Sequence, residues 1–260
     1  LLDGTDVLES KIELNLEHND YDLEASLEMY ETLNGPNSDR YEYVLPSYNF
    51  TKNFFLENLD GSFNFNTNGN NTLNSTNVTT SIVSNDLKYT SHDNFLNSGI
   101  KSNYGVFFKN INSTGKNNPQ YKSSLQSELT SAYMLNTSLP LTRNTGETFN
   151  TLEPKLSFRF SPHDMKNHNS LVRRIDISNI YNINRLGMNN SYETGESLTV
   201  GLDYKKEKIK IKDEIEEIED YLEFKLAMIF RNKHENNIPE NSTLNKKQSN
   251  IFGQFNYKPA

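Results

Sequence analysis

Apolar and polar residues alternate one by one along much of this chain, and that period of two constrains its fold more than any other feature. Because successive side chains of a β-strand point to opposite faces, each alternating run predicts a strand with one apolar and one polar face. The clearest runs are residues 11–17, 22–29, 155–160 and 197–204. Less regular runs occupy residues 63–65, 78–82, 104–108, 222–230 and 252–257.

Clusters of Gly, Asn and Pro separate the runs and predict turns between strands. They are residues 34–39, 66–71, 114–119 and 144–146. If a strand and its connection take roughly 20–25 residues, the chain would hold about ten to twelve strands, each long enough for the roughly 9–11 residues of a tilted membrane strand. The sequence therefore predicts an all-β, antiparallel fold.

The composition narrows the choice among all-β architectures. Only 34% of the residues are hydrophobic and the mean hydropathy is -0.76, whereas soluble domains carry roughly 45–50% apolar residues. An aromatic content of 11% nevertheless argues against disorder, which depletes aromatic residues. The apolar residues are therefore expected along one face of long strands. The net charge of -8 and the lack of a basic stripe argue against a nucleic-acid partner.

Two architectures accommodate strands with a single apolar face. In a soluble sandwich or solenoid the apolar faces meet in a core, whereas in an outer-membrane barrel they face lipid. Full charges stand on the polar faces, among them Glu13, Glu24, Glu28, Arg159 and Asp203. Tyrosines near several strand ends would suit the aromatic girdles of a barrel. We therefore expect an incomplete antiparallel transmembrane β-barrel of the outer-membrane type, with residues 1–260 in one barrel domain.

We expect neither a helical membrane anchor nor a signal peptide within this segment. Its longest apolar run, residues 226–230, is far shorter than the roughly 20 residues of a membrane helix. It starts at Leu1 without an initiator Met, which predicts an internal segment of a longer protein.

Residues 205–220 depart from the strand pattern as a dense block of charged side chains. Ile209 and Ile211 still alternate, which predicts a strand leaving the sheet into a solvated loop. Ile215 and Ile218 have helical spacing, so a partner-binding helix is the alternative.

No arrangement of residues predicts catalysis, a cofactor or a metal. His163, Asp164 and His168 lie in a polar stretch without a further ligand at useful spacing. Residues 64–75 imitate an EF-hand loop, but the twelfth position is Ser75 instead of a bidentate Glu. The nucleophile-elbow, P-loop and Rossmann patterns are missing from the sequence, so we do not expect an enzyme.

One part of the chain resembles a known family. Residues 152–162, followed after a variable stretch by residues 176–195, are similar to the middle of the barrel of LptD, the outer-membrane lipopolysaccharide-assembly family. In that family a strand of the form TPxLxxxYSP leads into DxxNLFxxNRFSGxDRxExG, and an LxxGLxY strand follows, as residues 198–204 do here. Residues 43–50 and 61–65 resemble two strands further upstream.

Seven residues, called here the signature residues, carry this resemblance. In order along the chain they are Asp176, Asn179, Asn184, Arg185, Gly187, Glu193 and Gly195. The resemblance implies structural roles: Asn and Arg on a lumen-facing strand would hydrogen-bond neighbours or a plug, and the glycines would permit tight turns or close packing. Leu186 and Met188 replace the family's usual aromatic and Ser, and the family's paired cysteines are absent.

The resemblance also implies a function and its partners. The whole protein would lie in the outer membrane of a Gram-negative cell and insert lipopolysaccharide into the outer leaflet through a lateral opening. An LptE-like lipoprotein would plug the barrel, and an LptA-like periplasmic bridge would deliver the lipopolysaccharide. A periplasmic jellyroll and the barrel-closing strands would lie outside this segment. The alternatives are another outer-membrane barrel, such as a porin or TonB-dependent receptor, and a soluble β-rich adhesin.

Overall fold

The computed structural model describes residues 6–34, 40–55, 59–146, 148–212 and 215–259. Strands dominate these ranges, and the one helical element within them is a 3-10 turn, η1 (Glu240–Ser242). The strands are β1 (Val7–Glu17), β2 (Tyr21–Thr32), β3 (Tyr41–Phe55), β4 (Gly61–Asn74), β5 (Val78–Ser91), β6 (Asn94–Phe95), β7 (Lys101–Lys116), β8 (Gln126–Ser138), β9 (Leu141–Asn144), β10 (Thr148–Ser161), β11 (Gly195–Lys212), β12 (Ile215–Arg231) and β13 (Phe252–Lys258).

All of these strands belong to one antiparallel sheet, which confirms the predicted all-β class. The hydrogen-bonded order is β1-β2-β3-β4-β5-β7-β8-β10-β11-β12-β13, with β6 paired to β7 and β9 paired to β10. Within the described ranges the order ends at β1 and β13, so the sheet is not closed there. The thirteen strands described exceed the predicted ten to twelve because β6 and β9 are short pieces of two and four residues.

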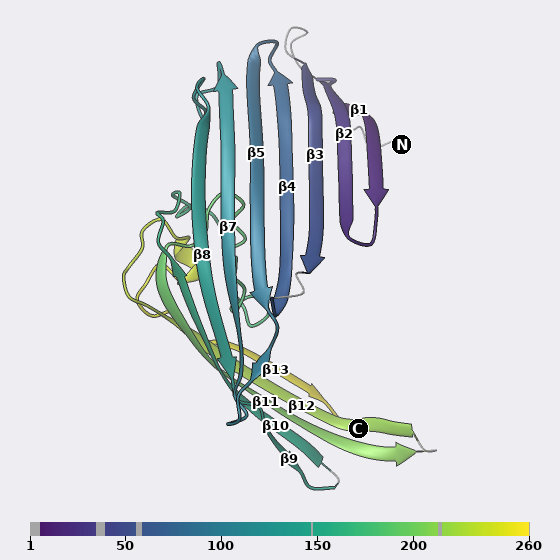
Figure 1. Cartoon of the computed structure of the whole chain (residues 1–260), viewed down its shortest axis with the longest axis vertical. Coiled ribbons are helices and arrows are strands. Elements are labelled where there is room, and N and C mark those ends of the chain that lie inside the picture. Colours follow the sequence, from purple (N-terminus) through teal and green to yellow (C-terminus); the bar gives the residue numbers. More distant parts are fainter. Residues whose placement is uncertain (1–5, 35–39, 56–58, 147, 213–214, 260) are drawn as a thin grey trace. The chain divides into compact units, whose positions relative to one another are not determined.

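The chain divides into two compact units. Unit 1 comprises Leu1–Tyr89 and Phe107–Thr130, and unit 2 comprises Thr90–Val106 and Ser131–Ala260. Strands β1–β4 belong to unit 1 and strands β9–β13 to unit 2, whereas β5, β7 and β8 contribute residues to both. Figure 1 labels the strands and colours them along the chain.

The Asn-rich residues 66–71 of unit 1 lie in the middle of β4, so the predicted turn is wrong there. The Asn66 Nδ2 donates to Asn49 Oδ1 at 2.9 Å and to Thr51 Oγ1 at 2.8 Å, both on β3. Asn favours turns when its side chain bonds to its own nearby backbone. Here a cross-strand partner takes that side chain instead, and the backbone stays extended.

Gly69 allows an aromatic ring to pack directly on the backbone of β4. It lies opposite Tyr48 of β3, and a Cβ at Gly69 would come within 2.7 Å of Tyr48 Cε1. A glycine inside a strand is commonly a place of such close approach. The ring of Tyr48 thus covers the backbone that a strand glycine would otherwise leave open.

A bulge interrupts β3 at Leu45 and Pro46. The pairing of β3 with β4 shifts between Val44 and Ser47. Proline has no N–H to give to a neighbouring strand, so a bulge is one of the few places where a sheet tolerates it.

The charged block, residues 205–220, continues the strands β11 and β12. Their pairing runs on to Lys212 opposite Ile215, with a register shift between Lys208 and Ile209. The strand prediction is therefore confirmed, whereas the helical alternative and the solvated loop are wrong for the described backbone. Residues 213–214 lie outside the described residues. The alternation of Ile209 and Ile211 predicted the strand correctly, whereas the helical spacing of Ile215 and Ile218 did not.

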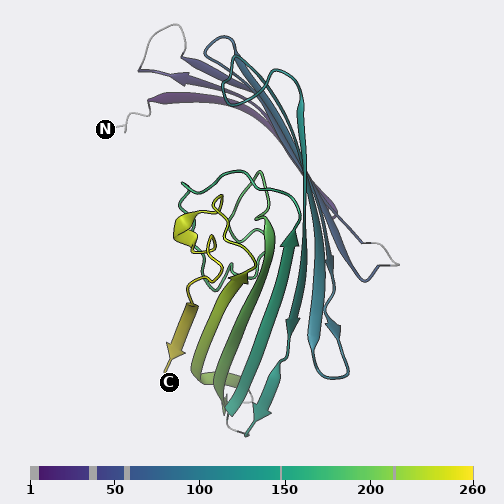
Figure 2. The same cartoon turned by 90° about the vertical axis from the view of Figure 1, so that its left-hand side faces the viewer.

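Unit 2 holds an apolar core between the sheet and two long connections. The connections are residues 162–194, between β10 and β11, and residues 232–251, between β12 and β13. Figure 2 shows them lying together at one end of β10–β12. The buried core residues are Met165, Ile175, Ile180, Leu186, Met188, Ala227, Ile229, Ile238 and Leu244. Since Ala227 and Ile229 belong to β12, the core joins both connections to the sheet.

We predict that Gly69→Ala destabilises unit 1 by roughly 1–3 kcal/mol, because the new Cβ would displace the Tyr48 ring. The double variant Tyr48→Ala/Gly69→Ala should be no less stable than Tyr48→Ala alone. Urea unfolding of wild type, the two single variants and the double variant gives the coupling energy. Asn70→Ala, at the exposed neighbouring position, is the control and should be close to wild type. Additive losses in the double variant would contradict this packing.

Candidate functional site

The signature residues lie in connection 162–194 and at the start of β11, not on a lumen-facing strand as expected for the Asn and Arg members. The segment is irregular because its polar groups bond locally, as the following turns show. The structure divides the signature into three groups: Asp176 with Asn179, Asn184 with Gly187, and Arg185 with Glu193 beside Gly195.

Asp176 and Asn179 close a turn. The Asp176 carboxylate accepts from the Ser178 backbone N–H at 2.8 Å, and the Asp176 N–H donates to Asn179 Oδ1 at 3.0 Å. Asn179 Nδ2 donates to the carbonyl of Arg174 at 3.1 Å. The hydrogen bond from the Ser178 side chain is the main reason that the pKa of Asp176 is lowered. Both residues therefore shape the chain locally.

Asn184 and Gly187 hold the next turn. Asn184 Nδ2 donates to the Met188 carbonyl at 2.8 Å, and its Oδ1 accepts from the Met188 N–H at 2.9 Å. Gly187 has a φ of 60°, which a residue with a Cβ adopts only at a cost. This turn buries Leu186 and Met188, which are 1% and 2% exposed. The two departures from the family pattern are thus core residues here.

Arg185 and Glu193 form a buried bidentate ion pair. Arg185 Nε donates to Glu193 Oε2 at 2.8 Å, and Arg185 Nη2 donates to Oε1 at 2.7 Å. Arg185 also donates to the hydroxyls of Ser197 at 2.9 Å and Thr199 at 3.1 Å, both on β11. The pair therefore fixes connection 162–194 to the sheet.

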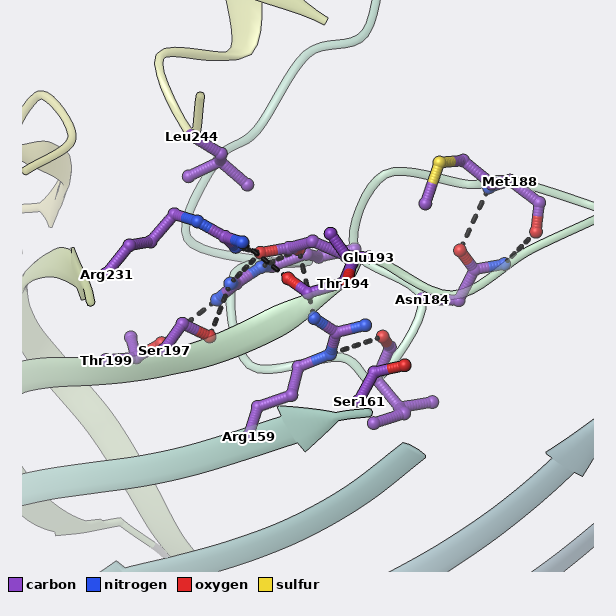
Figure 3. A network of polar contacts seen from close by, with 12 residues as sticks. Arg159, Ser161, Asn184, Met188, Glu193, Thr194, Ser197, Thr199, Arg231 and Leu244 are labelled. Carbon is purple, nitrogen blue, oxygen red and sulfur yellow. Dashed lines mark hydrogen bonds and ion pairs between the residues drawn. The ribbon is translucent and has the colours of Figure 1, made fainter. Parts of the chain in front are cut away.

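Two further arginines from the sheet converge on the same carboxylate, as Figure 3 shows. Arg159 of β10 lies directly across from Ser197 of β11, which lies across from Arg231 of β12. Arg231 Nη1 donates to Glu193 Oε1, and Arg159 Nη1 lies 3.4 Å from Glu193 Oε2. Arg231 Nη2 also donates to the carbonyl of Thr194. One carboxylate thus accepts hydrogen bonds from Arg185 and Arg231 and forms an ion pair with Arg159, so it joins three segments of the chain.

The whole cluster is shielded from water. Glu193 is 1% exposed, and Arg159, Arg185 and Arg231 are 3%, 4% and 7% exposed. Burial opposes the charged carboxylate, but the arginines outweigh it and lower the pKa of Glu193, with Arg185 the largest contributor. Glu193 is therefore an anion at neutral pH, and we call these four residues the Arg–Glu cluster.

Gly195 joins connection 162–194 to β11. Its φ of 79° turns the chain into the strand. A Cβ there would lie 3.5 Å from Arg231 Nη2, an ordinary contact, so the backbone angle is what requires glycine.

Sequence reasoning placed Arg159 on a polar strand face but did not connect it to Glu193, and it did not single out Arg231. The alternation that predicts β10 already places Arg159 on the same face as Ser157. Nothing in the run 222–230 pointed to Arg231, which follows it directly.

The arrangement offers hydrogen bonding and charge, chiefly from Arg185, Arg231 and Glu193. His168 Nε2 is bonded to Asn190 Oδ1 at 2.9 Å. Among the described residues, no group of three or more His, Cys, Asp or Glu lies close enough to hold a metal ion.

Comparison with known proteins gives no relative: no protein-family model matches the chain, and no curated protein matches it. Within the described ranges, no helix is long and apolar enough to cross a membrane.

We predict that Glu193→Gln loosens connections 162–194 and 232–251, because it leaves three buried arginines without a carboxylate. The loss should be roughly 3–5 kcal/mol, the usual cost of removing one partner from a buried ion pair. Hydrogen exchange would show faster exchange in both connections. Glu196→Gln, at an exposed position three residues away, should exchange like wild type. Equal protection in both variants would contradict a holding role for Glu193.

The stability that Glu193 contributes should depend on pH. Since its pKa is lower in the folded state than the ordinary 4.5, the contribution is complete above pH 4.5 and declines as the pH falls toward the folded pKa. The stability difference between wild type and Glu193→Gln should therefore shrink between about pH 5 and about pH 2. Urea unfolding along a pH series measures it. A difference that stays constant would show that Glu193 is not the titrating group.

Proposed function

We propose that this chain is part of the wall of an outer-membrane β-barrel whose whole protein inserts lipopolysaccharide into the outer leaflet. The observation that carries the membrane part is the inverted polarity of β10 and β11 in unit 2. On β10, Leu156 and Phe158 are 46% and 44% exposed, whereas Ser157 and Arg159 are 4% and 3% exposed. Apolar side chains point outward and polar ones inward, the reverse of a soluble sheet.

The outward apolar side chains continue from strand to strand. We call the face they form the open face of unit 2, and the face under the two connections the covered face. The exposed residues of the open face are Leu156, Phe158, Leu198, Val200, Leu202, Phe224 and Phe230. The pairing sets Phe158 against Leu198 and Leu198 against Phe230, so the residues form contiguous rows. Soluble monomers rarely expose contiguous apolar patches of more than a few hundred Å².

Unit 1 supports the same proposal through its first two strands. Ile12 and Leu14 of β1 and Leu27 of β2 are 73%, 53% and 46% exposed. Ile12 lies directly across from Leu27, and both lie on the face opposite Glu13 and Ser26. Each strand therefore offers lipid an apolar row while the polar row faces away.

Lipopolysaccharide as the substrate rests on the seven signature residues and their spacing. The turns they build and the buried pair of Arg185 with Glu193 are the kind of fixed internal structure that a barrel interior needs when its polar faces point inward. An LptE-like lipoprotein plug and an LptA-like bridge remain the partners proposed. The alternative is an outer-membrane barrel that carries solutes, and reconstitution into vesicles distinguishes the two functions.

The test is reconstitution of the purified chain into vesicles, with and without lipopolysaccharide. Heat-modifiable gel migration reports insertion, and photo-crosslinking to labelled lipopolysaccharide reports capture, with phosphatidylglycerol as the matched anionic lipid. Insertion with selective capture of lipopolysaccharide supports the full proposal. Insertion without selective capture favours a solute barrel, and a chain that stays in solution without detergent favours an adhesin.

We predict that a charge on the apolar face blocks membrane assembly. Leu27→Lys and Val200→Lys should each cost roughly 2–4 kcal/mol near the bilayer midplane. Ser26→Lys adds the same charge next to Leu27 but on the polar face, and it should assemble normally. The fraction of heat-modifiable protein in vesicles measures the effect. Normal assembly of both apolar-face variants would refute the assignment of the faces.

A further inference from the structure

The Arg–Glu cluster carries more positive than negative charge. Three arginines surround one glutamate, which leaves an excess of two positive charges on side chains that are at most 7% exposed. Removing a charge from water costs several kcal/mol unless a partner of opposite sign compensates it. Arginine keeps its proton under all ordinary conditions, so the cluster cannot relieve the excess by becoming neutral.

Part of the Arg159 guanidinium has no acceptor in the protein. Its Nε donates to the carbonyl of Ile183 at 3.1 Å. Its Nη2 is buried and makes no hydrogen bond within the described residues, and its Nη1 only approaches Glu193 at 3.4 Å without forming one. A buried charged donor without an acceptor is among the costliest groups in a protein interior. Arg159 is thus the member that most needs a further partner.

The other carboxylates nearby stand on the side of Arg231. A cavity of about 350 Å³ is lined by Arg231, Lys233, Asp164, Glu196 and Glu235. Asp164 and Glu196 are exposed to solvent, so water screens them, whereas Glu235 is half-buried and acts on Arg231. These acids would repel an anion from the cavity itself. Within the described residues none of these carboxylates accepts a hydrogen bond from Arg159, and an anion is therefore expected on the Arg159 side of the cluster.

We propose that Arg159 binds a small inorganic anion of the size of chloride, held between β10 and connection 162–194. The anion accepts from the Arg159 Nη groups and offsets one of the two excess charges. Its size follows from burial, because the Nη atoms are enclosed and a lipid phosphate with its substituents would not reach them. The proposal stands on unit 2 alone and does not depend on the function proposed above.

The first experiment measures thermal unfolding of the full chain in detergent, in sodium chloride and in sodium gluconate at equal ionic strength. Wild type should unfold at a higher temperature in chloride, because a ligand that binds only the folded state stabilises it. Arg159→Met should lose this chloride effect. Arg174→Met removes an exposed arginine from the same connection and should keep it.

Glu193→Gln should change the chloride effect in the direction opposite to Arg159→Met. This variant therefore distinguishes loss of the anion site from a general loss of stability. It raises the positive excess from two to three, so the difference in unfolding temperature between chloride and gluconate should grow even though the variant is less stable. An unchanged or smaller difference would overturn the proposal, as would a chloride effect that survives in Arg159→Met.

The direct readout is a crystal of the wild-type protein grown in sodium bromide. An anomalous peak within hydrogen-bond distance of the Arg159 Nη atoms establishes the site. No peak there, together with unfolding that is equal in chloride and gluconate, means that water satisfies these donors and the proposal fails. Phosphorus found at Arg159, or a lipid retained by wild type and lost in Arg159→Met in mass spectrometry, would also overturn it in favour of a lipid headgroup.

Discussion

Hydrogen bonding between the backbones of neighbouring strands is the interaction on which this structure depends. Unit 1 places many of its large apolar side chains in exposed positions, so burial alone does not hold it together. Its strands are instead joined by continuous antiparallel pairing, as over all eleven residues of β1. Where a residue cannot contribute, as at Pro46, the ladder bulges and resumes. Where no water can hydrogen-bond to the backbone, pairing between strands also satisfies the N–H and C=O groups of each strand.

Unit 2 adds a second kind of cohesion to that ladder. Its covered face carries both an apolar core and a buried ionic cluster, and each joins the connections to the sheet. The core supplies most of the free energy, since a buried ion pair gains little once its desolvation is counted. The Arg–Glu cluster instead specifies position, because Glu193 meets Arg159 and Arg231 only when the strands are in register. The two connections are thereby held in one arrangement.

Much of the sheet follows from the sequence, because alternation reports directly on which side each residue faces. The runs 155–160 and 197–204 lie in β10 and β11 with the expected apolar face. The run of β8 was missed, since Ala132 and Met134 place apolar residues on the face opposite Tyr133 and obscure the period. Residues 66–71 were misjudged because composition shows that Asn can turn a chain, but not that a neighbouring strand will bond its amide.

The site was only partly foreseeable. The resemblance singled out Arg185 and Glu193, eight residues apart, and the structure pairs them. It could not supply Arg159 and Arg231, because their meeting depends on the register of three strands rather than on any local pattern. The Asn and Arg members of the signature were expected on a strand, and their placement in a connection reflects turns that Asp176 and Asn184 close with their own side chains.

The convergence of three arginines on Glu193 has a consequence for how the sequence can change over time. A lysine at Arg185 would keep the charge but lose the planar fork that grips both carboxylate oxygens, so even a substitution of like charge is not neutral. Loss of Glu193 leaves three cations facing each other, whereas loss of one arginine leaves the carboxylate paired. Related sequences should therefore tolerate substitution of Arg159 more readily than substitution of Glu193. Substitutions at the four positions should also be correlated with each other.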